Sequence, residues 1–101
     1  MLKAVFHKKD TDFCRFEISG HAGYGTEGNE IVCAAVSSCT MLVCNCITEN
    51  FKSNAEVNVE ENRITLRLSE RDEAAVKLLS AFYEHLEMIS RDYSKVKLMI
   101  V

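Results

Sequence analysis

The sequence predicts a two-layer α/β fold, in which two helices cover one mixed, mostly antiparallel five-stranded sheet. Three observations support this prediction. The chain has 101 residues, a length that favours a single domain spanning residues 1–101. Alternating and helical patterns of apolar residues follow each other in the order β-β-α-β-β-α-β. Each helix comes directly after a pair of strands, so both helices can pack on the same sheet.

The first two strands are predicted at residues 2–7 and 13–19, because apolar and polar side chains alternate in both segments. The polar turn between them, residues 8–12, is short and favours an antiparallel hairpin. In the second strand, the side chains expected on one face are Cys14, Phe16 and Ile18.

The first helix is predicted to begin after Asn29, a good N-cap residue, and to run to about Asn50. The stripe expected to pack on the sheet consists of Ile31, Ala34, Ala35, Ser38, Met41 and Leu42. The opposite side is also apolar, with Val36, Cys39 and Val43. This is more apolar surface than one sheet requires, and burial against a second subunit is one explanation.

The clearest hairpin joins strands at residues 54–60 and 63–68 through the turn Glu61-Asn62. The side chains expected to face the core are Ala55, Val57, Val59, Ile64, Leu66 and Leu68.

The second helix is predicted to begin at a Ser69 cap, with Asp72 completing a weak variant of the capping box. Its apolar stripe consists of Ala75, Leu78, Leu79, Phe82, Leu86, Ile89 and Tyr93. Residues 95–101 are expected to form the last strand.

The segment between the second strand and the first helix holds all four glycines, at positions 20, 23, 25 and 28. His21 opens this loop, and Cys33 falls at the fourth helical position after Asn29. The positive end of the helix favours the charged thiolate, and His21 could take the thiol proton and return it to a leaving amine. The alternative interpretations are a small buried cysteine and a surface histidine.

Two further residues lie on the same side of this helix as Cys33. Glu30 could orient His21, or it could interact only with the helix dipole. Ser37 could hydrogen-bond the site, or it could bond the carbonyl one turn back. Tyr24 could flank a bound peptide or fold onto the loop.

Gly20-His21-Ala22, followed by the run Gly-Asn-Glu-Ile-Val-Cys-Ala-Ala-Val-Ser at residues 28–37, resembles the signature of the ribosomal-processing cysteine protease family Prp. Length and element order resemble that family across nearly the whole chain. The resemblance implies a small bacterial α/β homodimer and a Cys–His endopeptidase, and we expect a cytoplasmic location. Its substrate would be the N-terminal extension of bacterial large-subunit ribosomal protein number twenty-seven.

By this resemblance, His21 and Cys33 would form the catalytic dyad, with Glu30 and Ser37 in support. The loop would close on the substrate, and the residues expected to contact it are Gly20, Ala22, Gly23, Tyr24 and Gly28. Glu30 is a departure, because the family usually has Asp at this position.

Composition limits the other function classes. The net charge of −3 disfavours direct nucleic-acid binding but permits binding to a basic protein tail. The five cysteines match no zinc pattern and suit a reducing compartment, so we expect no metal and no cofactor. Residues 31–48 carry no charge, but their serines, threonines and asparagine make a membrane span costly, and we expect none.

Two alternative functions remain from the sequence. The first is a non-catalytic, ribosome-associated module that binds a peptide in the same groove. The second is a redox or metal-binding thiol protein, suggested by the number of cysteines.

Overall fold

The structure, a computed structural model, describes residues 2–20 and 29–101, and it confirms the predicted fold class and element order. The elements are β1 (Leu2–Lys9), β2 (Asp12–Gly20), α1 (Asn29–Asn45), the π-helical segment η1 (Cys46–Asn50), β3 (Ala55–Glu60), β4 (Arg63–Leu68), α2 (Glu73–Asp92) and β5 (Val96–Ile100).

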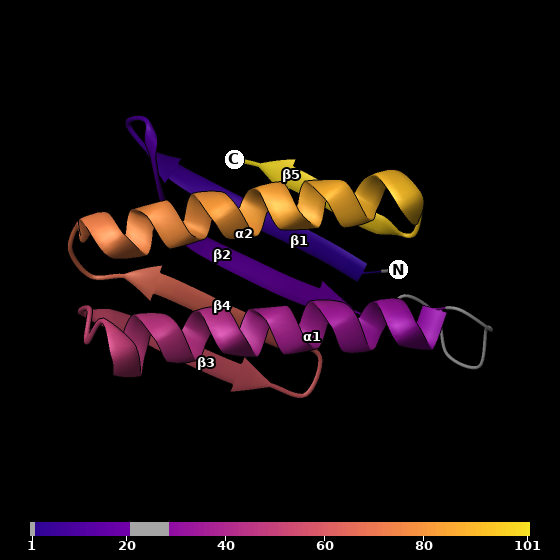
Figure 1. The fold of residues 1–101 in the computed structure, drawn as a ribbon, viewed down its shortest axis with the longest axis horizontal. Coiled ribbons are helices and arrows are strands. Elements are labelled where there is room, and N and C mark those ends of the chain that lie inside the picture. The colour runs from indigo at the N-terminus through magenta and orange to yellow at the C-terminus, as the bar shows by residue number, and fades with distance from the viewer. Residues whose placement is uncertain (1, 21–28) are drawn as a thin grey trace.

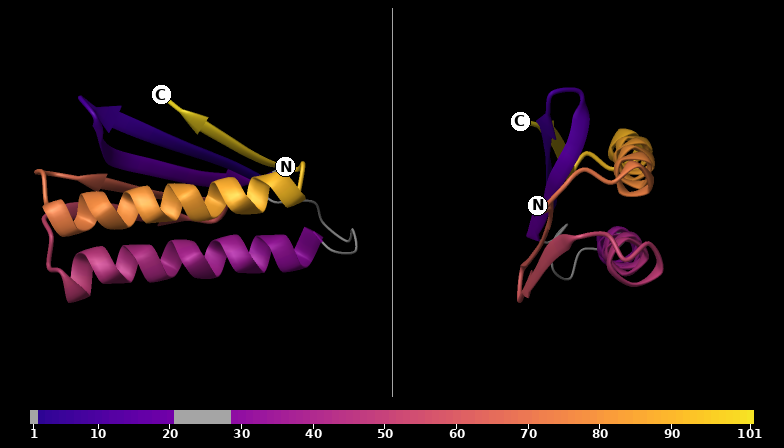
Figure 2. Two further views of the ribbon diagram at one scale, coloured as in Figure 1. Left: turned by 45° about the horizontal axis from the view of Figure 1, so that its top comes forward. Right: turned by 90° about the vertical axis from the view of Figure 1, so that its left-hand side faces the viewer.

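The five strands form one sheet in the order β3-β4-β2-β1-β5. All neighbouring pairs are antiparallel except β1 and β5, which run parallel. Both helices lie on one face of this sheet, with α1 on the β3–β4 side and α2 on the β1–β2 side (Figures 1 and 2). The other face is covered by no described element (Figure 2, right).

The core lies between the central strands and α2, and it is built around aromatic rings. The ring centroid of Phe6 in β1 lies 5.8 Å from that of Phe16 in β2 and 5.6 Å from that of Phe82 in α2. The rings of Phe16 and Phe82 are 5.1 Å apart in an edge-to-face arrangement. Such contacts add to the hydrophobic burial and fix α2 across the centre of the sheet.

A β-bulge corrects the predicted faces of the second strand. The register pairs His7 with Arg15 and Lys8 with Phe13, so Cys14 is the extra residue of β2. Phe13 therefore takes the core side, where it is buried, and Cys14 is only half-buried. A single inserted residue reverses the alternation beyond it, and no residue pattern in the strand marked its position.

The first helix presents a different face to the sheet from the one predicted, and the expected stripe was wrong. Its buried side chains are Val32, Val36, Thr40, Val43, Cys44 and, in η1, Ile47. Ile31 is 71% exposed and Leu42 is 64% exposed. Because both sides of the helix are apolar, periodicity alone could not decide which side would face the sheet.

Both helix starts also differ from the prediction. Helix α1 begins at Asn29 itself, so Cys33 is its fifth residue rather than its fourth. The cap of α2 is Asp72 and not Ser69, because the Asp72 carboxylate accepts a hydrogen bond from the backbone N–H of Ala75 at 3.1 Å. Asp72 has the extended backbone typical of a cap residue.

The segment Ile31–Asn50 is long and apolar enough to cross a membrane by length and composition, with a mean hydropathy of 1.9. A third of its residues are buried inside the protein. Core helices of soluble proteins pass the same test, so the absence of a membrane span stays a prediction.

Candidate active site

A cavity of about 210 Å³ lies where the start of α1, the end of β2 and the β3–β4 turn meet. Three of the predicted site residues line it: Gly20, Cys33 and Ser37. Its apolar wall consists of Leu2, Ile18, Val59 and Ile64, and its polar rim consists of Glu60, Glu61, Asn62 and Arg63.

Cys33 reaches this cavity because α1 begins only one turn before it. Helix side chains lean toward the N-terminus, so the thiol is directed back toward the helix start. The residue is half-buried and packs against the core. The first turn of any α-helix leaves backbone N–H groups without partners inside the helix, and these can stabilise negative charge.

Gly20 and Ser37 complete the predicted residues at the cavity. Gly20 ends β2 with φ near 80°, the left-handed region that glycine adopts without strain. Its N–H donates a 3.0 Å hydrogen bond to the carbonyl of Asn62, which ties the end of β2 to the β3–β4 turn. Ser37 lies one turn after Cys33 and is exposed.

The remaining predicted site residues are not placed. His21, Ala22, Gly23, Tyr24 and Gly28 lie outside the described residues. Glu30 lies in the first turn of α1, and its side chain also lies outside the description. The structure therefore brings together Cys33, Ser37 and Gly20 and leaves the rest of the predicted site as a prediction.

The β3–β4 turn was missed as part of the site. Sequence analysis recognised the hairpin but not that β4 pairs with β2, which brings Asn62 beside Gly20. Val59 was expected in the core, yet it is 63% exposed and lines the cavity. An exposed valine in the cavity that Cys33 also lines offers an apolar contact for a ligand. The alternating pattern of a hairpin predicts neither which strand β4 pairs with nor that Val59 is exposed.

The charges around the cavity are mainly acidic. Glu60 and Glu61 lie on the rim, and the only rim cation described there, Arg63, forms a 3.1 Å ion pair with Glu17. This rim suits a ligand that carries positive charge close to an apolar group.

Comparison with known protein families assigns the chain to one of them. The model of the family described as cysteine protease Prp matches residues 1–97. The chain belongs to the Prp cysteine protease family. None of the curated protein sequences compared with the chain matches it.

Solved structures share the fold over the whole chain. The essential ribosomal processing protease Prp of Staphylococcus aureus, with a covalently linked product peptide, superposes with a TM-score of 0.90 at 21% identity, covering 100% of both chains. The same protease with a substrate peptide gives 0.90 at 20% identity, again covering 100% of both. SMU.848 from Streptococcus mutans gives 0.86 at 26% identity, covering 100% of this chain and 96% of the other.

The other cysteines of this Prp family member lie away from the cavity. None of the five forms a disulfide. Burial raises the pKa of the Cys44 thiol to about 11, so that thiol stays neutral and inaccessible. Within residues 2–20 and 29–101, no three His, Cys, Asp or Glu side chains lie close enough together to hold a metal ion.

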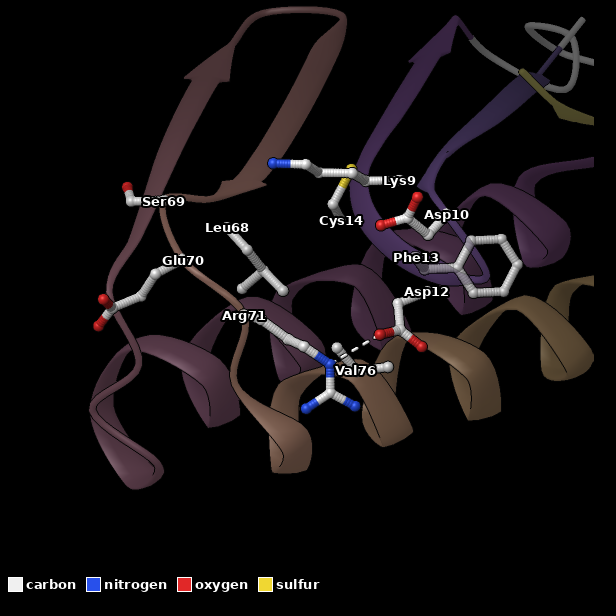
Figure 3. Close-up of a pocket in the computed structure, with 10 residues that line it drawn as sticks. All are labelled: Lys9, Asp10, Asp12, Phe13, Cys14, Leu68, Ser69, Glu70, Arg71 and Val76. Carbon is white, nitrogen blue, oxygen red and sulfur yellow. Dashed lines mark hydrogen bonds and ion pairs between the residues drawn. The ribbon is translucent and has the colours of Figure 1, made fainter.

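A second cavity of about 210 Å³ lies at the far end of the β1–β2 hairpin, beside the start of α2 (Figure 3). Arg71 and Asp12 both line it and form an ion pair at 2.7 Å. The hydrogen bond to Asp12 raises the pKa of Arg71. None of the predicted site residues that the structure describes lines this cavity, so it is not the candidate active site of the Prp fold.

Proposed function

We propose that this chain is a cysteine endopeptidase that removes the N-terminal extension of bacterial large-subunit ribosomal protein number twenty-seven. The observation that carries the proposal is Cys33, which lines the cavity at the start of α1 in a chain of the Prp cysteine protease family. The S. aureus relatives are described as a ribosomal processing protease in complex with substrate and product peptides, which supports this substrate class.

In this mechanism, His21 takes the proton of the Cys33 thiol, and the thiolate attacks the carbonyl carbon of the scissile peptide bond. Backbone N–H groups of the first turn of α1 stabilise the oxyanion. His21 then gives its proton to the leaving amine as the C–N bond breaks. A water molecule, deprotonated by His21, hydrolyses the thioester and restores the thiol.

Two observations support His21 as the partner of Cys33. Gly20, to which His21 is bonded, lines the same cavity as Cys33. The hydrogen bond from Gly20 to Asn62 anchors the residue before His21. Glu30 would orient His21 or stabilise its protonated form, and Ser37 would hydrogen-bond within the site.

The substrate would be held by Gly20, Ala22, Gly23, Tyr24 and Gly28, with Val59 as an apolar contact. Ribosomal proteins carry basic segments, and Glu60 and Glu61 give the rim of the cavity the complementary charge. We place the protein in the cytoplasm, where cysteines that form no disulfide remain reduced.

The test is mass spectrometry of a peptide that spans the junction of the extension, incubated with the protein. Wild type should cut the peptide at one bond. Cys33→Ala and His21→Ala should each lower kcat/KM at least about 10³-fold, because the nucleophile or its base is lost.

Cys39→Ala is the matched control, because Cys39 is half-buried on the same helix and does not line the cavity. It should cut at a rate near that of wild type. Cleavage by Cys33→Ala would contradict the proposal. Binding of the peptide by wild type without any cleavage would favour the alternative, a non-catalytic peptide-binding module.

We also propose that a second copy of the chain covers the outer face of α1. Ile31 and Leu42 on this face are 71% and 64% exposed, and Met41 beside them is 40% exposed. Contiguous exposed apolar surface of this kind is typical of an interface. The molar mass in solution, measured by light scattering, should be twice that of one chain.

A further inference from the structure

The face of the sheet opposite the helices carries most of its charge as basic side chains. Five of the 12 Lys and Arg residues point to this open sheet face: Lys3, Arg15, Arg63, Arg67 and Lys97. Three of the 15 acidic residues share it: Glu17, Glu56 and Glu60. The open sheet face is therefore net positive in a protein whose net charge is −3.

The strand register arranges these cations in two rows. One row contains Arg67 of β4 and Arg15 of β2, which lie directly opposite each other, and it continues to the neutral His7 of β1. The other row contains Arg63, Lys3 and Lys97, and in it Lys3 lies opposite Lys97. The rows are four residues apart along the strands, which corresponds to about 13 Å.

Direct cross-strand pairs of like charge destabilise a sheet. The pairs Arg15–Arg67 and Lys3–Lys97 both have this unfavourable arrangement. The glutamates compensate for it only in part: Glu17 pairs with Arg63 at 3.1 Å and with Arg15 at 3.8 Å, and Glu56 pairs with Arg67 at 2.9 Å.

Arg15 is incompletely paired within the protein. Its Nε is buried and has no hydrogen-bond partner among the described residues. A buried N–H of a charged group without a partner costs free energy. The Arg15 side chain as a whole is 40% exposed, so its accessible part can contact an anion on the open sheet face. Guanidinium groups suit phosphate because they can donate two parallel hydrogen bonds.

We propose that the open sheet face binds the backbone of an RNA duplex. Two cationic rows about 13 Å apart fit the two phosphate strands on either side of a groove, whereas an acidic peptide would present a single line of charge. Asn58, Thr65 and Glu17 lie between the rows. These side chains can bond the 2′-hydroxyl groups that line the shallow minor groove of RNA and that DNA lacks.

This proposal departs from the expectation of no nucleic-acid partner, which was based on net charge. Arg63 and Glu60 belong both to this face and to the rim of the cavity that holds Cys33. RNA binding can still be tested apart from the thiol chemistry, because Lys3, Arg67 and Lys97 do not line that cavity. A protein that holds RNA on one face would meet basic ribosomal proteins while they are bound to their own RNA.

The test measures binding to a fluorescent RNA duplex of about 16 base pairs by anisotropy, at several salt concentrations. Lys3→Gln, Arg67→Gln and Lys97→Gln are combined in one variant, because all three residues are exposed and none lines the active-site cavity. The matched control combines Lys52→Gln, Lys77→Gln and Arg91→Gln, which are exposed and lie off this face. Both variants lose the same charge.

Wild type should bind, and its affinity should fall steeply with salt. The face variant should bind at least about tenfold more weakly, with a salt slope reduced by about 2 to 3. The control variant should stay within about twofold of wild type. Thermal unfolding measurements verify that both variants are folded. If the triple face variant does not fold, the double variant Lys3→Gln, Lys97→Gln replaces it.

Equal losses in the two variants would overturn the proposal, as would the absence of binding by wild type at low salt. Equal affinity for a DNA duplex of the same sequence would overturn the assignment to RNA. Binding of a polyglutamate peptide at least as tightly as RNA would assign the face to an acidic protein instead.

Discussion

At the scale of single residues, two cysteines of the same helical run lie in different surroundings. Cys33 lies in the first turns of α1 and lines a cavity, whereas Cys44 is 3% exposed near the helix end. Burial raises the pKa of Cys44 to about 11, because the thiolate cannot be solvated there. The two side chains are chemically identical, and their positions in the fold give only Cys33 access to a cavity.

This contrast predicts a selective alkylation pattern. Iodoacetamide at pH 8 should label Cys33 within minutes and leave Cys44 unlabelled. Raising the pH to 10 should still leave Cys44 mostly unlabelled, because its pKa lies near 11 and it remains largely protonated. Peptide mapping by mass spectrometry measures both sites. Unfolded protein, in which every thiol is accessible, is the control. Equal labelling of the two cysteines in the native state would show that the site does not distinguish them.

At the scale of the elements, the start of α2 depends on one carboxylate. The hydrogen bond from the Ala75 N–H lowers the pKa of Asp72, because it stabilises the charged form. A lowered folded-state pKa contributes stability that is present above the ordinary value of 3.8 and is lost as pH falls through the folded value.

Asp72→Ala should therefore lower the melting temperature by a few degrees at pH 7, and the difference from wild type should shrink below pH 4. Thermal unfolding followed by circular dichroism measures this. Asp92→Ala is the matched control, because Asp92 is exposed at the other end of α2, where a negative charge opposes the helix dipole. An equally large decrease in the melting temperature of Asp92→Ala would mean that loss of the cap is not the cause.

At the scale of the whole molecule, the surplus apolar surface of α1 predicts self-association. Leu42→Glu should halve the molar mass measured by light scattering, because it places a charge in the proposed interface. Glu84→Gln, an exposed change on α2, should leave the mass unaltered. A wild-type protein that is monomeric at about 100 μM would exclude the dimer.

The element order, the two helices over one sheet and the site segment around Cys33 were predicted from the sequence, because local periodicity and the glycine-rich signature are properties of consecutive residues. It was harder to predict which side of a strand or helix faces the core. The Cys14 bulge reverses the alternation of β2, and α1 is apolar on both sides, so local patterns could not identify the buried side.

The sequence by itself determined the order of helices and strands and singled out Cys33 and His21 as candidates for thiol chemistry. Only the tertiary structure decided that the β3–β4 turn meets Gly20 and Cys33, and that cations from four strands gather on one open face. The physical reason is that strand order and register join residues far apart in the chain. Long-range strand pairing depends on the packing of the whole sheet, so it cannot be predicted from any short segment of the sequence.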